Sequence, residues 1–163
     1  MWEHFNEINA AYVWQGVPMA DIVNWHSEMS TYLKSMDPHG HIVTTSVSMT
    51  EITGLWAVTN IDFSQAHDYG NQVDLTLLRD RIVTREAATG KPHVVGEFSK
   101  VSTEPRLQDQ ALMAKELRRG NWRGMFSPTP ILPLTWWYDY HEEYGHQWVL
   151  AAAANFHKEI WKG

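Results

Sequence analysis

The 163-residue sequence contains no cysteine, which excludes disulfides and leaves the redox compartment undetermined. Basic residues are also few: 13 Lys and Arg stand against 19 Asp and Glu, for a net charge of −6. This balance argues against a nucleic-acid partner, which needs a surface of clustered basic side chains. No apolar run is long enough to span a bilayer, so we expect no membrane segment. Residues 1–4 are not a basic region followed by an apolar one, so we expect no signal peptide, and the localisation stays open.

Motifs for nucleotides and metals are missing as well. The sequence has no glycine-rich phosphate loop of the Gly-x-Gly-x-x-Gly or Walker type, so we expect no cofactor. His4, His39, His41 and His141 do not have the spacing of a metal site, and we expect no bound metal. Ser99 has no nucleophile elbow around it, which argues against a serine hydrolase.

Hydrophobic residues make up 44% of the chain, as in an ordinary globular domain, and Trp is frequent, with nine residues. Short β-branched or apolar runs alternate with longer helical patterns. We expect strands at residues 1–6, 42–47, 61–66, 93–97 and 131–137, and helices at 20–36, 72–88, 108–120 and 146–161. This alternation predicts an α/β fold with a parallel sheet, in a single domain over residues 1–163.

Two details of the helices follow from the pattern. The helix at 20–36 should present an apolar face made of Ile22, Trp25, Met29, Tyr32 and Leu33. Gly120 should end the helix at 108–120, since glycine is common where helices stop.

Two of the expected strands lead into a glutamate. Glu7 follows the strand at 1–6, and Glu97 ends the strand at 93–97, directly after Gly96. A carboxylate at the mouth of a buried strand is costly unless it is paired, and Gly96 allows another group to approach the backbone closely. Two acids that face one pocket, one protonated and one ionised, are the minimum requirement for hydrolysing a glycosidic bond. Taken alone, the Asn6-Glu7 dipeptide is a weak signal, and a solvated turn is the alternative interpretation.

Polar and aromatic residues follow two other strands. His67 and Tyr69 come after the strand at 61–66 on one side of an extended segment, where they could bind a carboxylate and a sugar hydroxyl. Capping of the strand end is an equally good interpretation. Trp136 and Trp137 lie at the end of the last strand, and one of them must point inward. Either could be a platform beneath a sugar ring or a packing residue.

Four stretches, in this order, resemble one known group of enzymes. They are Trp-Glu-His-Phe-Asn-Glu at 2–7, Tyr-Leu-Lys-Ser-Met-Asp-Pro at 32–38 with His-Ile-Val-Thr-Thr-Ser at 41–46, Lys-Pro-His-Val-Val-Gly-Glu-Phe at 91–98, and Asn-Trp-Arg-Gly-Met-Phe-Ser at 121–127. Together they resemble the retaining glycoside hydrolases of clan A, the cellulase- and mannanase-like (β/α)8 barrels. The resemblance is nearest to a little-characterised bacterial group within that clan, and it extends over nearly the whole chain.

The resemblance implies a role for each candidate residue. Glu7 would be the general acid/base after barrel strand four, and Glu97 the nucleophile at the end of strand seven. Asn6 would bind the 2-hydroxyl of the reacting sugar. His67 and Tyr69 would line the site from strand six, with Tyr69 touching Glu97. Trp136 or Trp137, on strand eight, would form the floor of a sugar subsite.

The resemblance also implies the architecture: five parallel strands corresponding to barrel strands 4–8 with outer helices, a partial, half-barrel-like TIM barrel. Strands one to three, and a basic residue that clan members carry near the nucleophile, have no counterpart here, whereas a closed barrel has about 250 residues. The inner face and both sheet edges would therefore be open. We expect a homodimer or larger oligomer to cover them, or else a separate partner chain.

The leading hypothesis is a retaining β-glycoside hydrolase that acts on a β-linked polysaccharide, a glucan or a mannan, by double displacement. The alternative is a non-catalytic or barely active half-barrel that binds carbohydrate or needs a partner to complete the barrel. The identity of the sugar and the endo or exo mode stay open.

Overall fold

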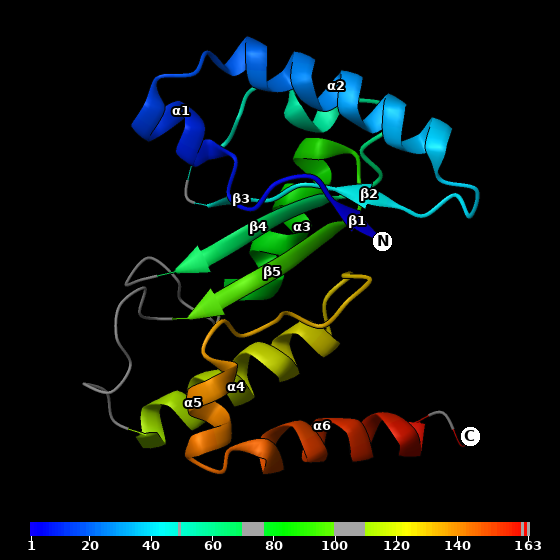
Figure 1. Ribbon diagram of the computed structural model, residues 1–163. Helices are drawn as coiled ribbons and strands as arrows, with labels where there is room; N and C mark the ends of the chain where they lie inside the picture. Colours follow the sequence, from blue (N-terminus) through cyan, green and yellow to red (C-terminus); the bar gives the residue numbers. More distant parts are fainter. Residues whose placement is uncertain (49, 70–76, 100–109, 161, 163) are drawn as a thin grey trace.

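The computed structural model describes residues 1–48, 50–69, 77–99, 110–160 and 162 (Figure 1). Its elements, in chain order, are β1 (Trp2–Glu3), α1 (Asn9–Gln15), α2 (Met19–Met36), β2 (Val43–Thr44), β3 (Val47–Ser48), the 3-10 helix η1 (Leu55–Ala57), β4 (Ser64–Tyr69), α3 (Leu78–Thr89), β5 (His93–Ser99), α4 (Gln110–Met125), α5 (Tyr138–Glu143) and α6 (Gln147–Ile160). The strands form two small parallel sheets, in the orders β1-β2 and β3-β4-β5. The expected α/β fold with parallel strands is confirmed, and it is compatible with a partial TIM-barrel-like fold.

Backbone hydrogen bonds extend the parallel pairing beyond β1 and β2. Trp2 N donates to Ile42 O at 2.9 Å, and Ile8 N donates to Ser46 O at 3.0 Å. Residues 2–8 therefore run alongside 42–46, so the chain that leads into α1 is tied to the segment between β2 and β3. The predicted strand at 1–6 is found as the shorter β1. The predicted strand at 42–47 is divided into β2 and β3.

The expected strand at 131–137 is wrong. This segment approaches β5, and Phe98 N donates to Leu134 O at 2.8 Å, but only Thr135 forms an isolated parallel bridge, with Phe98. Pro133 has no N–H to donate, and proline interrupts a ladder of strand hydrogen bonds. The described sheets have two and three strands, so the expected five-stranded sheet is not confirmed.

Strand β4 begins and ends three residues later than the predicted 61–66. Asp62 accepts hydrogen bonds from Val43 N and Lys34 Nζ, both at 2.7 Å, which fixes a bend before the strand. The polar residues 67–69, expected in a loop, continue the strand because the fold gives each side chain a partner.

The four predicted helices are found as α2, α3, α4 and α6, whereas α1, α5 and η1 were not predicted. The predicted positions 72–76, 108–109 and 161 lie outside the described residues. Within the described ranges, no helix has the length and apolar character needed to cross a membrane.

The buried face of α2 differs from the predicted one. Ile22, His26 and Ser30 are buried, whereas Trp25 and Tyr32 are exposed. His26 contacts Ile22 O through Nδ1 at 2.8 Å and Thr45 Oγ1 through Nε2 at 3.0 Å. A polar residue can therefore occupy the inner face, because the facing strand supplies its hydrogen-bond partner.

Gly120 does not end its helix, which continues to Met125. A side chain at this position would lie 2.2 Å from the Cζ atom of Phe98. Gly120 is therefore the point where α4 approaches β5 closely, and its absence of a side chain serves packing rather than termination.

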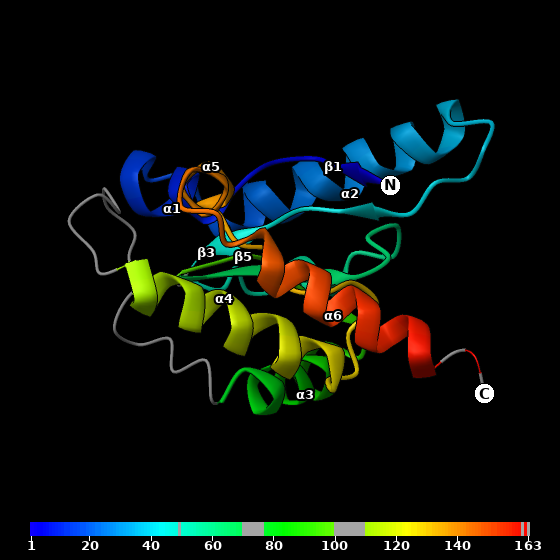
Figure 2. The same ribbon diagram turned by 90° about the horizontal axis from the view of Figure 1, so that it is seen from below.

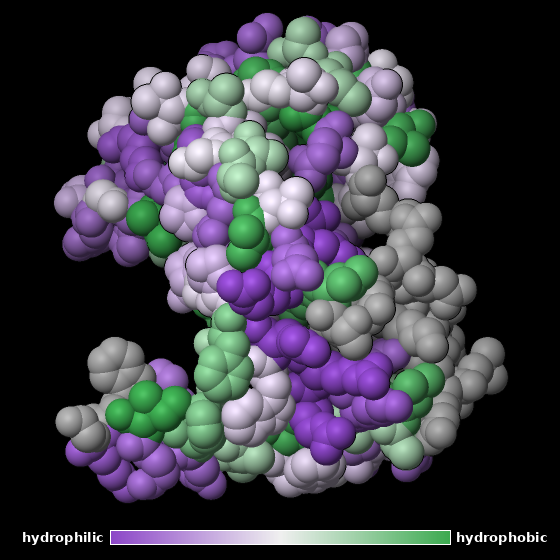
Figure 3. Space-filling view, turned by 180° about the vertical axis from the view of Figure 1, so that it is seen from behind, coloured by the Kyte–Doolittle hydropathy of each residue, from purple (hydrophilic) through white to green (hydrophobic). Residues whose placement is uncertain are grey.

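The helices lie around the strands in a consistent pattern (Figures 1 and 2). In Figure 1, α3 lies behind β4 and β5, α2 lies beyond β2, and α4 and α6 lie beyond β5. No described helix passes in front of β4 and β5 in this view. From behind, the middle of the surface is largely hydrophilic, with scattered hydrophobic side chains (Figure 3). The view from behind, where α3 lies, thus shows a mainly polar surface.

Two hydrophobic clusters stabilise this arrangement. One lies between α2, the 52–61 segment and β3, and the other joins α3, β5, α4 and α6. The first contains Ile8, Ile22, Val47, Ile52, Leu55, Val58, Ile61 and Ala66; the second contains Leu78, Ile82, Val95, Phe98, Leu117 and Val149. Ile8 anchors the turn after β1 in the first cluster, directly beside Glu7.

Candidate active site

Glu7 lies in an unusual backbone conformation in the turn between β1 and α1. Its φ of 52° makes it the one non-glycine residue with positive φ among those described. A left-handed conformation costs a non-glycine residue about 1–2 kcal/mol. The turn is fixed from the neighbouring strand, because Glu7 N donates to Ser46 Oγ at 2.9 Å and Ser48 N donates to Asn9 Oδ1 at 2.6 Å. Such strain is characteristic of functional positions.

Glu97 is aimed by a bulge in β5. The pairing of β4 with β5 runs regularly to Ala66 and Val95 and then skips Gly96, so that His67 pairs with Glu97. Paired residues of parallel strands point to the same face, so the bulge turns Glu97 toward the side of His67. A side chain on Gly96 would lie 2.8 Å from Gln65 Cδ. The expected close approach at Gly96 is therefore confirmed, and the approaching group is Gln65.

The two carboxylates meet at one histidine. His67 is 2% exposed, and its Nδ1 lies 2.8 Å from Glu7 Oε1 and 3.2 Å from Glu97 Oε2. Ligand atoms of all three residues lie within 4.8 Å of one another, which includes one oxygen of each carboxylate. The contact with Glu7 is a hydrogen bond, whose hydrogen comes from the imidazole Nδ1 or from the carboxyl group, and the contact with Glu97 is at ion-pair distance. Both carboxylates thus contact the same buried imidazole.

Tyr69 completes this group from the end of β4. Its hydroxyl donates to Glu97 Oε2. Burial, this hydrogen bond and the charges of Glu97 and Glu7 raise the pKa of the Tyr69 phenol far above its usual value. The phenol therefore stays protonated and remains a donor to the Glu97 carboxylate.

An open cleft of about 370 Å³ lies over these residues. Its lining comes from the β1–α1 turn, α1, the ends of β3, β4 and β5, and the segment before α5; the residues are Asn6, Glu7, Trp14, Ser48, Tyr69, Glu97 and Trp136. His67 lies beneath this surface and touches both carboxylates. The structure thus brings together all but one of the candidate site residues.

The exception is Trp137, which stacks edge-on against Tyr140 at a ring distance of 5.8 Å and does not line the cleft. Of the two neighbouring tryptophans, Trp136 is the one that faces the carboxylates. Trp14 was not singled out from the sequence, because α1 was not predicted. Ser46, which holds the backbone of Glu7, was missed because no local pattern indicates so distant a contact.

Glu7, His67 and Glu97 are also the described residues best placed to hold a metal ion, since each offers one ligand atom. Their separation along the chain explains why sequence spacing did not indicate them. The described contacts already use these atoms in a hydrogen bond and an ion pair. We therefore interpret the group through its acid–base chemistry.

The side of β4 opposite the cleft carries a structural polar network. Asp68 accepts a hydrogen bond from Arg85 at 3.1 Å, and His93 contacts Ser64 Oγ at 2.8 Å. Burial and the charge of Arg85 lower the pKa of His93 to about 3, so this imidazole is neutral near neutral pH. These groups join α3 to the sheet and lie away from the cleft.

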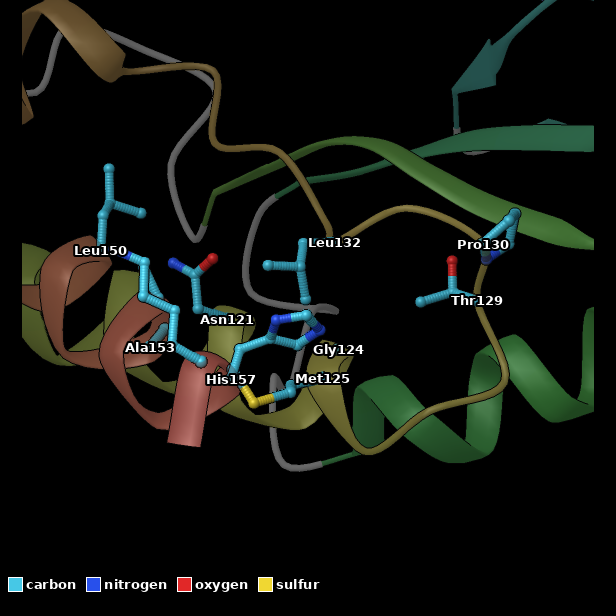
Figure 4. Close-up of a pocket in the computed structure, with 11 residues that line it drawn as sticks. Asn121, Gly124, Met125, Thr129, Pro130, Leu132, Leu150, Ala153 and His157 are labelled. Carbon is cyan, nitrogen blue, oxygen red and sulfur yellow. The ribbon is translucent and has the colours of Figure 1, made fainter. Parts of the chain in front are cut away.

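A larger cavity of about 560 Å³ lies elsewhere, between α4, α6 and the 129–132 segment (Figure 4). Leu150, Ala153 and His157 project into it from α6, and Asn121 and Met125 from α4. Among the described residues that line it there is no carboxylate. It lacks the paired acids found over β4 and β5, so the acid–base site is the smaller cleft.

No protein-family model matches the sequence, and no curated protein matches it. Among solved structures, the chain is similar to the X-ray structure of the endo-beta-1,4-mannanase from Thermotoga petrophila, with 18% identity and a TM-score of 0.46. The similarity covers 72% of this chain and 31% of the mannanase, so the chain spans less than a third of that protein's length. A similarity this distant and partial assigns neither a family nor an activity to this chain.

Proposed function

We propose that the chain acts as a retaining β-glycoside hydrolase on a β-linked glucan or mannan. The observation that carries this proposal is the approach of Glu7 and Glu97, with a carboxylate oxygen of each within 4.8 Å of the other, at one open cleft. Retaining pairs are separated by about 5–5.5 Å, whereas inverting pairs stand about 6.5–9.5 Å apart to admit a water. The short separation favours direct attack by one carboxylate.

In this mechanism Glu97 attacks the anomeric carbon and forms a glycosyl ester, while Glu7 gives its proton to the departing oxygen. Water then attacks the anomeric carbon, Glu7 takes the water's proton, and Glu97 leaves as a carboxylate. Tyr69 donates to Glu97 and holds the attacking carboxylate in place. His67, in contact with both acids, orients them and supports the change in charge between the two steps.

We further propose that the described sheets form one side of a TIM-like barrel, with five parallel segments in the order 2–8, 42–48, 64–69, 93–99 and 134–135. The hydrogen bonds from Trp2 to Ile42 and from Phe98 to Leu134 support this order. In such an arrangement the carboxylates lie at the carboxyl ends of the strands, where barrels carry their active sites.

The second candidate function is carbohydrate binding without turnover. The observation that favours it is the composition of the cleft: among the residues that the structure describes, its lining includes no Lys or Arg to support the charge of the nucleophile. A site with paired acids and aromatic walls but without that support would bind sugar and hydrolyse it slowly.

The deciding experiment measures release of reducing sugar from soluble glucan and mannan. Glu97→Gln should abolish turnover, because an amide cannot form the glycosyl ester. Glu7→Gln should lower turnover of the polymer but spare substrates with good leaving groups, which need little protonation. Glu3→Gln is the matched control, because Glu3 is an acid of the same segment that bonds Gln65 and does not line the cleft. Activity that survives Glu97→Gln unchanged overturns the proposal.

A further inference from the structure

Trp14 is the most exposed of the large hydrophobic side chains in the described part of the chain, at 80%. An indole in water forgoes the stabilisation that burying its faces would give. Trp14 lies on α1, which is followed by its C-cap residue Gly16. The start of this helix is fixed by the buried residues Ile8 and Asn9. The exposed ring therefore projects from an anchored element.

The position of α1 places the Trp14 ring at the candidate active site. Trp14 lines the same cleft as the two carboxylates and Trp136. In Figure 1, α1 lies above the arrowheads of β4 and β5, and α5 lies below them. Trp14 belongs to α1, and Trp136 lies two residues before α5, so the two indoles come from elements on opposite sides of these strand ends.

The chemistry of the acids then distinguishes the two sides. The proton donor must lie beside the departing oxygen, and Glu7 leads directly into α1. The nucleophile must lie beneath the sugar that stays attached, and Glu97 is on β5, which is bridged to the segment carrying Trp136. The side of α1 is therefore the side on which the leaving group lies.

We propose that Trp14 is a platform for a sugar ring on the leaving-group side of the scissile bond. A β-linked pyranose with equatorial hydroxyls presents faces of C–H groups, which match the apolar face of an indole. The ligand class is a β-linked oligosaccharide with at least one ring on each side of the bond that is cut. This inference rests on the proposed function for its direction, but not for the stacking itself.

The first test measures binding of cellotetraose and mannotetraose to the Glu97→Gln protein by isothermal titration calorimetry. Adding Trp14→Ala should weaken the tighter of the two complexes by about tenfold, the loss expected when one aromatic platform is removed. Trp148→Ala is the matched control, because Trp148 is also an exposed indole, at 56%, but lies on α6 and does not line the cleft. It should leave the affinity unchanged.

The second test addresses the side of the bond, using the protein with Glu97 intact. A sugar acceptor on the leaving-group side can replace water: its hydroxyl oxygen bonds to the anomeric carbon, its proton passes to Glu7, and Glu97 departs as a carboxylate. Trp14→Ala should lower the ratio of this transfer product to hydrolysis product at a fixed concentration of cellobiose or mannobiose. Trp148→Ala should leave that ratio unchanged, because Trp148 lies on α6 and does not line the cleft.

The outcomes separate this inference from the proposed function. If the Glu97→Gln protein binds either tetrasaccharide and Trp14→Ala has no effect, the platform is wrong and the hydrolase proposal stands. An unchanged ratio of transfer to hydrolysis overturns the assignment to the leaving-group side. If neither tetrasaccharide binds and no sugar is released, the proposed function itself is overturned, and the platform with it.

Discussion

His67 Nδ1 lies 2.8 Å from the Oε1 atom of Glu7, although 60 positions separate the two residues. The contact joins the turn after β1 to the middle of β4, across the segment of β3 that lies between them. It depends on a Glu7 backbone that is left-handed and is held there by Ser46. The position of the proposed acid is therefore determined by the fold around it and not by its own conformational preference.

The strained backbone of Glu7 predicts that this residue reduces stability. Asn tolerates a left-handed conformation better than other non-glycine residues. Glu7→Asn should therefore have a free energy of unfolding about 1 kcal/mol higher than Glu7→Gln, which removes the same charge but keeps the strain. Urea unfolding of both variants measures the difference. Equal stabilities would mean that the conformation of Glu7 stores no strain.

The close approach of Gly120 and Phe98 predicts an unusual response to alanine. Gly→Ala in an exposed helix interior stabilises by about 1 kcal/mol. At Gly120 the new methyl group would overlap the Phe98 ring, so Gly120→Ala should destabilise by about 1–3 kcal/mol. Combining it with Phe98→Leu should recover part of that loss, which a double-mutant cycle of unfolding free energies detects. Additive effects of the two substitutions would contradict this packing.

The buried His93 predicts a loss of stability in acid. Its pKa is about 3 in the folded chain and 6.5 when unfolded, so the unfolded chain binds the proton more readily. The contribution is fully present above pH 6.5 and is lost as the pH falls from 6.5 toward 3, by up to about 1.4 kcal/mol per pH unit. Unfolding midpoints at several pH values should fall less steeply for His93→Gln. The exposed His39→Gln is the control and should keep the slope of the parent protein.

The sequence was sufficient to predict the parts of the fold that local pattern determines. Helical periodicity located α2, and β-branched runs located β2 and β5. It could not predict which face of α2 is buried, because that depends on Thr45 facing His26. It also placed a strand across Pro133, where only one bridge forms.

The candidate site likewise contains residues that the sequence identifies and features that only the folded structure reveals. Glu7 and Glu97 were identifiable because each follows an apolar run, and His67 and Tyr69 because of their spacing. The bulge at Gly96 was not predictable, since only the pairing with β4 reveals it. Trp14 was missed for a related reason: α1 is a seven-residue helix with little periodicity, and its stability comes from contacts to β3.

The last prediction concerns assembly, because the segments at the two outer edges of the described strands expose apolar side chains. Trp2 and Phe5 are exposed beside β1, and Leu132 and Leu134 are exposed beside β5. At about 25 cal/mol per Å² of apolar surface, covering a few hundred Å² contributes several kcal/mol, comparable to the stability of a marginal domain. We therefore expect a homodimer or larger oligomer in which a second copy covers these edges.

Light scattering after size exclusion, over a range of protein concentrations, measures the mass. Leu134→Lys should shift the population toward monomer, because it places a charge on the apolar edge. Val83→Lys is the matched control: Val83 is an exposed aliphatic residue on α3, on the helix-covered side, and the substitution should leave the mass unchanged. A monomer of 18.8 kDa at every concentration, with cooperative unfolding, would show that the chain needs no second copy to cover its strands.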